Sequence, residues 1–213
     1  FTRFASDIKD LGVPNYMAER TDLGTYVLSK QAGDRGRFVT PSLRGLAHSA
    51  PYMHNGKFAT LREAVTTTGW PKLGRARGKL IFTIDLSAEA NKPYAEGHPS
   101  LQGRAAFMTT FPDAPEAAYF TMNEPEQQQA EIQALVKQGF LIRTRADADT
   151  KEARTGATTR REAALASGAQ YISTDYLWPD DRFGTGYTAT LPDGAITRCN
   201  PILTATGCDA KAE

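Results

Sequence analysis

The stretch AAYFTMNEPEQQQAEIQALVKQGFLIRTRAD (residues 117–147) decides the fold of this chain. Its first part, AAYFTM (117–122), is a short run of residues that favour β-strands. The tripeptide Glu124-Pro125-Glu126 follows, and proline in the first turn with acids near the helix dipole is typical of a helix start. FLIRTRAD (140–147) then returns to the composition of a strand. This order predicts two parallel strands joined by a right-handed crossover.

Elements of the same kind lie on both sides of this unit. Three more strand-like runs are KLIFTID (79–85), RAAFMTTF (104–111) and QYISTDY (170–176). Two capping boxes, Thr60-Leu-Arg-Glu63 and Thr159-Arg-Arg-Glu162, predict helices that end near Gly69 and Gly168, because threonine and glutamate satisfy the first backbone N–H groups. The pattern therefore predicts an α/β fold with five parallel strands, too few for a complete eight-stranded barrel.

The chain before the first capping box is built differently. Glycine and proline interrupt every apolar run in residues 1–57, so long helices or strands are not expected there. We expect three parts: a loop-rich arm over 1–65, an α/β unit over 66–190 and a tail over 191–213.

Composition excludes several classes of function. The 25 Lys and Arg residues nearly balance 24 Asp and Glu, so no overall field favours nucleic acid. No apolar run approaches the roughly 20 residues of a membrane span. The two cysteines, Cys199 and Cys208, form either a short disulfide-closed loop in the tail or two free thiols; we favour the disulfide, which suits a secreted or periplasmic protein. Neither CxxCH nor a CxxC zinc pair occurs, and three unrelated histidines give zinc little support.

One strand carries a candidate binding site. Arg143, Arg145 and Asp147 alternate along 140–147, so all three should lie on the same face. Two guanidinium groups beside a carboxylate can hold phosphate, because the arginine fork matches phosphate oxygens. A ladder of ion pairs that fixes the strand register explains the same residues. Asp85, which ends its strand, is well placed for a substrate or a metal ion.

Several long motifs in the right order show a resemblance that covers residues 60–208. They are WPKLGRARGKLIFTIDLS, YAEGHPSLQGRAAF, LVKQGFLIRTRADADTKEARTGATTRREAALASGAQYISTDY and RFGTGY…RCNP. They resemble the bacterial calcium-dependent phosphoinositide phospholipase C-like family, specifically the C-terminal half of its TIM barrel. The resemblance implies a partial parallel (β/α) barrel made of its late strands. It also implies a phosphodiesterase that acts on phosphoinositides or lipid headgroups.

The same resemblance assigns roles to individual residues. Arg143 and Arg145 would hold phosphate, and Asp85, Asp147 or Asp175 would orient a base or the inositol. The family's histidine motif and most of its calcium carboxylates come from the other half of the barrel. The catalytic residues are therefore unknown, Ca²⁺ would find an incomplete site, and His98 reads as a surface or capping residue rather than a general base. The open half-barrel predicts self-association or a partner chain that completes it.

A second resemblance covers residues 1–65. GRFVTPSLRGLAHSAPYMHNGKFATLREAV (36–65) resembles the C-terminal haem domain of the di-haem cytochrome c peroxidase/MauG family, which implies a mostly helical, cytochrome c-like arm. It places Met53, His54 and Arg44 near the haem and puts the axial-ligand position on Thr68, a poor iron ligand. Haem c would have to come from a missing segment or a partner, since CxxCH is absent. The competing interpretation of residues 52–54 is a packed, hydrogen-bonded turn.

The two resemblances meet at FATLREAV (58–65), as expected of a chimera joined at a shared helix. Three hypotheses about function follow. The chain is a phospholipase C-like phosphodiesterase that is incomplete as a catalyst by itself. Alternatively, it is a c-type haem peroxidase or electron-transfer protein without its haem-attachment part. The third hypothesis is a non-catalytic designed or truncated fusion.

Overall fold

The computed structural model describes residues 29–34, 58–191, 194–203 and 208. The chain divides into two compact units, Phe1–Ser42 and Leu43–Glu213. The described part of the first unit contains one short 3-10 helix, η1 (Ala32–Asp34). Most of the predicted N-terminal arm lies outside the described residues, so its helical character stays a prediction.

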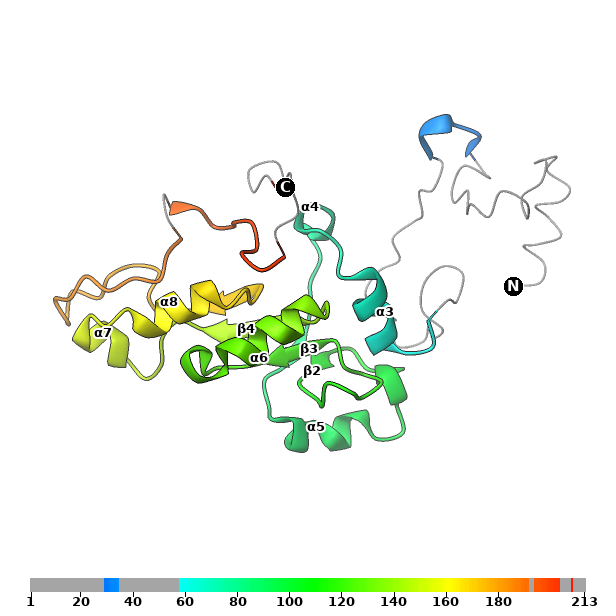
Figure 1. Cartoon of the computed structure of the whole chain (residues 1–213), viewed down its shortest axis with the longest axis horizontal. Helices are drawn as coiled ribbons and strands as arrows, with labels where there is room; N and C mark the ends of the chain where they lie inside the picture. Colours follow the sequence, from blue (N-terminus) through cyan, green and yellow to red (C-terminus); the bar gives the residue numbers. More distant parts are fainter. Residues whose placement is uncertain (1–28, 35–57, 192–193, 204–207, 209–213) are drawn as a thin grey trace, which may run out of the picture. The chain divides into compact units, whose positions relative to one another are not determined.

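The second unit is built on short parallel sheets, as Figure 1 shows. One sheet has the order β3-β4-β5, formed by β3 (Tyr119–Thr121), β4 (Leu141–Arg145) and β5 (Tyr171–Ser173). The other pairs β1 (Thr83–Ile84) with β2 (Phe107–Met108). The predicted parallel α/β fold is therefore confirmed. The described residues form no closed barrel, and the finer prediction of a partial TIM barrel is not established by these sheets.

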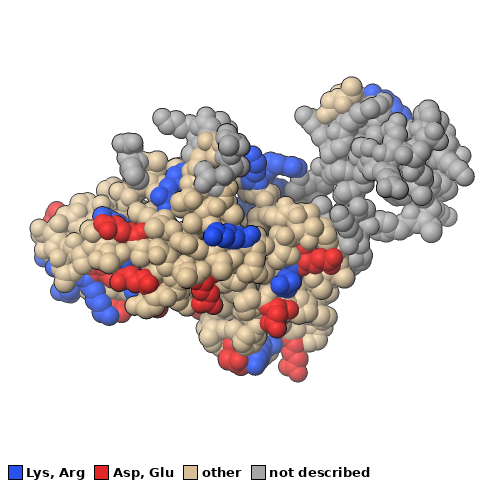
Figure 2. Space-filling model, viewed as in Figure 1, with Lys and Arg blue, Asp and Glu red and all other residues tan. Residues whose placement is uncertain are grey.

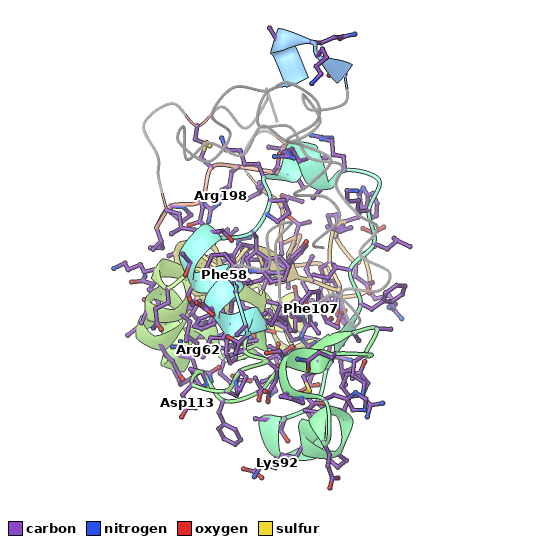
Figure 3. The ribbon with its side chains drawn as sticks, turned by 90° about the vertical axis from the view of Figure 1, so that its right-hand side faces the viewer. Phe58, Arg62, Lys92, Phe107, Asp113 and Arg198 are labelled. Atoms are coloured by element: carbon purple, nitrogen blue, oxygen red, sulfur yellow. A yellow bond between two sulfur atoms is a disulfide. The ribbon has the colours of Figure 1, made fainter. Side chains whose placement is uncertain are left out.

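Helix α3 (Leu61–Thr68) begins with the predicted capping box. The Glu63 N–H donates to Thr60 Oγ1 (3.1 Å), and the Glu63 carboxylate accepts from the Ala59 N–H (3.1 Å). The side chains of Phe58 and Arg62 lie at this helix in Figure 3. Phe58 is buried in the core, and Arg62 Nε donates to the Pro112 carbonyl (2.7 Å). Both contacts fasten α3 to the sheet unit.

Helix α6 (Pro125–Lys137) also follows its prediction, with Pro125 in the first turn and Gly139 just after the end. Gly139 has φ 96°, and a Cβ there would lie 2.7 Å from the Val65 carbonyl oxygen. Glycine is therefore required twice, by the left-handed backbone and by the close approach of α3.

The prediction of the second capping box is wrong by one residue at the N-cap. Helix α8 spans Thr159–Ala166, and its N-cap is Thr158 rather than Thr159. The Thr158 hydroxyl donates a hydrogen bond to the Glu162 carboxylate (2.7 Å), and the Thr158 side chain caps no backbone N–H group. Two consecutive threonines made the register ambiguous in the sequence.

Four short helical elements were not predicted: α4 (Leu73–Ala76), α5 (Ala88–Ala95), η3 (Pro99–Leu101) and α7 (Lys151–Thr155). The longest, α5, has a regular N-cap, because the Ser87 hydroxyl accepts from the Ala90 N–H (3.3 Å). Pro93 inside it is a residue that normally argues against a helix. Helix α5 places a crossover between β1 and β2.

The core lies between the larger sheet and α6. Phe140, Ile142, Ile132 and Val136 are fully buried there. Helix α8 lies beside α6 in Figure 1, and the Gln129 and Gln133 side chains of α6 reach α8 carbonyls (3.5 Å each). Both helices therefore pack on the same side of the larger sheet.

The tail is fixed to the same unit. The predicted disulfide between Cys199 and Cys208 is confirmed. Asn200 Nδ2 donates to the Gly168 carbonyl (2.7 Å), and Ile202 packs against the core.

No helix in the described ranges is long and apolar enough to cross a membrane. Figure 2 shows acidic and basic side chains interspersed on one face of the molecule, without a single-sign patch there.

Candidate functional site

A groove of about 380 Å³ lies on the face of the sheet that α6 does not cover. Side chains alternate along a strand, so Phe120 and Ile142 enter the core while Tyr119, Leu141 and Arg143 face the groove. The lining residues are Ile81, Thr83, Asp85, Tyr119, Leu141, Arg143, Tyr171, Ile172 and Ser173. The groove is thus largely apolar, with one guanidinium and one carboxylate in its wall.

Arg143 is held by partners from two other strand ends. Its Nη1 donates to Asn123 Oδ1 (2.7 Å), just after β3, and lies 3.5 Å from Asp85 Oδ2, just after β1. The Arg143 side chain is 23% exposed and that of Asp85 is 61% exposed. The firm contact is therefore the neutral one to Asn123, and the carboxylate contact is long and open to water.

Arg145 lies two residues further on the same face of β4. Its Nη2 is 3.7 Å from Asp175 Oδ2, which follows β5. Asp175 is again the exposed partner, at 69% against 30% for Arg145. Both arginines thus meet a carboxylate from a neighbouring strand end, and exposed pairs of this kind contribute about 1 kcal/mol or less to stability.

Asp147 differs from the two arginines, because it is 1% exposed and does not line the groove. Its carboxylate accepts from the Thr174 hydroxyl (2.5 Å), the Asp175 N–H (2.9 Å) and the Tyr187 hydroxyl (3.4 Å). Burial, followed by the nearby Asp147 charge, raises the pKa of Tyr187 above its ordinary value. Asp147 therefore holds the segment after β5, including the backbone of Asp175.

The described residues do not fit a calcium ion. No group of three or more His, Cys, Asp or Glu side chains gathers in the described ranges as metal ligands would. Asp85 and Asp175 face arginines, and the oxygens of Asp147 accept three hydrogen bonds. Calcium prefers six to eight oxygen ligands. This part of the chain therefore lacks a sufficient donor set.

His98 occupies a structural position. It is half-buried at the N-cap of η3, and its Nδ1 donates to the Gln102 carbonyl (2.5 Å). It does not line the groove. Its side chain makes no N-cap hydrogen bond, so the expected surface or capping role stays a prediction.

Sequence reasoning missed two residues that support the groove, Asn123 and Arg160. Arg160 of α8 donates to both carboxylate oxygens of Glu124 (2.9 and 3.1 Å) and to the Asn123 carbonyl. The hydrogen bond from Arg160 lowers the pKa of Glu124. Asn123 could have been predicted from the sequence, because it follows the strand 117–122 and polar residues at the carboxyl ends of parallel strands face the binding crevice. Nothing local in the sequence marks Arg160.

The haem-neighbouring candidates Met53, His54 and Arg44 lie outside the described residues. Thr68, the position matched to an axial ligand, is described. Its hydroxyl donates to the Ala64 carbonyl (2.6 Å), so this hydrogen bond is made within α3.

Comparisons with known proteins give two different relationships. The sequence model of the family described as "Phosphoinositide phospholipase C, Ca2+-dependent" matches residues 41–201. Among curated proteins, the chain is 41% identical over 92 residues to "Cytochrome-c peroxidase IdrP2" of Denitromonas iodatirespirans, which is 43% of this chain and 24% of that protein. It is 56% identical over 76 residues to the IdrP2 of Pseudomonas sp. (strain SCT), which is 36% of this chain and 20% of that protein.

A third relative, the IdrP1 of the same Pseudomonas strain, is 47% identical over 83 residues, covering 38% of this chain and 22% of that protein. The chain thus spans about a quarter or less of the length of these relatives. No solved structure matches it significantly. Both resemblances seen in the sequence are confirmed.

Proposed function

Because the chain belongs to the Ca²⁺-dependent phosphoinositide phospholipase C family, we propose that it binds the phosphorylated headgroup of a phosphoinositide or a similar phosphodiester. The proposed site is the groove beside β4, which Arg143 and Asp85 line, together with the neighbouring pair Arg145 and Asp175, which lies outside the groove lining. Arg143 and Arg145 bind the phosphate, and Asp85 and Asp175 accept hydrogen bonds from the hydroxyl groups of the inositol. The chain is a phosphoric diester hydrolase-like module rather than a complete catalyst.

One observation carries this proposal: two guanidinium groups lie on the open face of β4, each with a mostly exposed carboxylate at 3.5 to 3.7 Å. A phosphate group can replace these carboxylates, because its oxygens offer bidentate acceptors to the guanidinium fork, whereas each aspartate contact here is long and mostly exposed. The released carboxylates can then accept hydrogen bonds from a polyol. The apolar wall of Tyr119, Leu141 and Tyr171 suits the C–H face of a sugar-like ring.

Cleavage of the diester requires groups that the described residues do not assemble. General acid–base catalysis needs a proton donor and acceptor within hydrogen-bond reach of the reacting oxygens, and no histidine lines the groove. We therefore propose that a partner chain or a further segment supplies the catalytic groups, together with any Ca²⁺ ligands. The confirmed disulfide supports a secreted or periplasmic location, since disulfides persist in oxidising compartments.

The test is binding of a soluble headgroup, myo-inositol 1-phosphate, measured by calorimetry. Arg143→Gln should weaken binding about tenfold or more, because it removes a charged contact to phosphate. Lys137→Gln is the matched control, since it removes a positive charge from an exposed position on α6 outside the groove. Equal affinity in wild type and Arg143→Gln would contradict the proposed site.

The similarity to cytochrome-c peroxidases supports a second candidate function, a contribution to a haem protein. It rests on identities of 41% and 56% over 92 and 76 residues. A visible spectrum of the purified chain, with and without added haem, tests it. A Soret band that shifts in His54→Ala would support haem contact, and a colourless protein under both conditions would exclude it.

We also propose that the uncovered sheet face promotes association. Tyr171, which lines the groove, is 48% exposed, and β5 has one described partner strand. Exposed strand edges and apolar faces favour pairing with another chain. Sedimentation should show a dimer or a complex with a barrel-completing partner, and a stable monomer at all concentrations would count against this.

A further inference from the structure

Another pocket, of about 430 Å³, lies between helix α5 and the segment that follows β2. None of its described lining residues lines the groove beside β4. Its wall is mainly apolar, with one aromatic ring and two carboxylates, and the residues concerned are Met108, Pro93, Ala95, Phe111, Glu96 and Glu116. Pro93, the unusual residue inside α5, thus forms part of a pocket wall. The volume falls in the range of small-molecule sites.

The two walls of this pocket are held together by a buried amide. Asn91 of α5 is 1% exposed, and its Nδ2 donates to the carbonyls of Leu86 and Thr109 (3.2 and 2.9 Å). In the opposite wall, the Ala114 N–H donates to the Phe111 carbonyl (3.0 Å) and closes a turn. The pocket is therefore formed before a ligand arrives, and binding requires little ordering of the chain.

One carboxylate of the pocket is oriented by a buried hydroxyl group. Thr110 is 7% exposed, and its Oγ1 donates to Glu116 Oε1 (3.0 Å). Glu116 is half-buried and forms no ion pair with any residue that the structure describes. Glu96 is exposed and likewise has no ion-pair partner within the described ranges. Two carboxylates thus line the pocket without a positively charged partner.

The aromatic wall already carries an ammonium group of the protein itself. Lys92, which Figure 3 shows on α5, has its Nζ 5.3 Å from the centre of the Phe111 ring, within the range of a cation–π interaction. The same Nζ pairs with Glu89 (2.6 Å), and the side chains of Lys92 and Glu89 are 61% and 69% exposed. Exposed pairs of this kind are weak. Another ammonium group can therefore replace Lys92 at the ring.

These features favour an ammonium ligand over an anion or a metal ion. Because Lys92 is paired with Glu89, the carboxylates of Glu96 and Glu116 leave the pocket with negative charge. An ammonium group can donate to an oriented carboxylate while its charge lies over an aromatic face. A metal ion such as Ca²⁺ needs more oxygen ligands, and the described residues gather no group of three or more His, Cys, Asp or Glu side chains.

We propose that the pocket beside α5 is a binding site for a small primary alkylammonium ligand. The ammonium group displaces Lys92 from the Phe111 ring and donates to the Glu116 carboxylate. The alkyl stem packs on the apolar side chains of Met108 and Pro93. This inference goes beyond the proposed function, because it concerns a different pocket and a ligand of opposite charge.

Titration with n-butylammonium chloride, followed by heteronuclear NMR, tests the site, and sodium chloride at the same ionic strength is the blank. The amide signals of Lys92, Thr110 and Glu116 should shift in a saturable way, while those of Thr83 and Arg143 in the groove should not. 1-Butanol has nearly the same shape without the charge and should bind about tenfold more weakly or less. Tetramethylammonium has no N–H to donate and should also bind more weakly. Equal binding of 1-butanol and n-butylammonium, or shifts confined to the groove, would overturn the proposal.

Four variants test the individual contacts. Glu116→Gln should weaken n-butylammonium binding about tenfold, because it removes the charged acceptor. Glu131→Gln is its matched control, since it removes an exposed carboxylate of α6 outside the pocket. Phe111→Leu keeps an apolar side chain and should weaken binding about two- to fivefold. Lys92→Met should strengthen binding by a similar factor, about two- to fivefold, because the competing ammonium group is gone. Weaker binding by Lys92→Met, or unchanged binding by Glu116→Gln, would refute the site.

The same ligand separates this pocket from the proposed headgroup site. Glu116→Gln should bind myo-inositol 1-phosphate with wild-type affinity, and Arg143→Gln should bind n-butylammonium with wild-type affinity. Loss of n-butylammonium binding in Arg143→Gln would place both ligands in one site and would overturn this inference.

Discussion

Replacement of Asp147 by alanine should destabilise the protein more than any change in the groove itself. Asp147 is 1% exposed, and its carboxylate accepts from Thr174, Asp175 and Tyr187. The Tyr187 hydroxyl can still donate to the Ala146 carbonyl (3.0 Å). The alanine variant therefore leaves two donors without this acceptor, the Thr174 hydroxyl and the Asp175 N–H. At about 1.5 to 3 kcal/mol for each hydrogen bond to a charged group, we expect a loss of about 3 to 6 kcal/mol.

Urea unfolding followed by circular dichroism measures this loss, and two variants calibrate it. Asp147→Asn should cost less, about 1 to 2 kcal/mol, because the amide oxygen can still accept from the Asp175 N–H. Asp149→Asn is the control: its contact with Lys151 is 3.9 Å long with both side chains at least 76% exposed, so it should have almost no effect. A loss below about 1 kcal/mol in Asp147→Ala would refute the reasoning.

Three further predictions follow. The raised pKa of Tyr187 means that the folded state keeps the phenol proton to a higher pH than the unfolded chain does. Its contribution to stability is therefore fully present below about pH 10 and is lost as pH rises further. The urea midpoint of unfolding should fall less steeply with rising pH in Tyr187→Phe than in the wild type. The lowered pKa of Glu124 means that its pairing with Arg160 stabilises above about pH 4.5 and is lost as pH falls. Glu124→Gln should remove that pH dependence at a cost of about 1 kcal/mol or less, because Glu124 is 55% exposed, as acid titration of unfolding will show. Gly139→Ala should destabilise by more than about 1 kcal/mol in thermal unfolding, because the new Cβ would meet the Val65 carbonyl.

The strand positions were readable from the sequence because β-rich apolar runs are local signals. Strand β4 (Leu141–Arg145) falls inside the predicted 140–147. Strand β1 is only Thr83–Ile84 of the predicted 79–85, because it pairs with β2 alone over those residues and Leu80 stays 74% exposed. Composition predicts which residues favour a strand, but the partner decides how many of them are paired.

What could not be read from the sequence depends on distant contacts between polar groups. Helix α5 buries Asn91, whose amide donates to the carbonyls of Leu86 and Thr109 (3.2 and 2.9 Å). A hydrophobic pattern does not mark a buried amide. Arg160 donates to the carbonyl of Asn123, which lies 37 residues earlier in the chain. Arginine is usually a surface residue, so its presence at position 160 does not predict that hydrogen bond. The alternation of Arg143 and Arg145, by contrast, follows from strand geometry and was predicted.

The hydrogen bonds around β4 bear on whether its arginines serve a ligand or only the strand register. A register ladder would place its closest contacts between the charged partners, but these are 3.5 and 3.7 Å apart and their aspartates are mostly exposed. The short contact is Arg143 to Asn123 (2.7 Å), and Asn123 is in turn held by Arg160, which pairs with Glu124 at 2.9 and 3.1 Å. A neutral amide orients a guanidinium without neutralising it. A phosphate can therefore displace Asp85 while Asn123 keeps Arg143 in position, which favours the ligand site over the ladder.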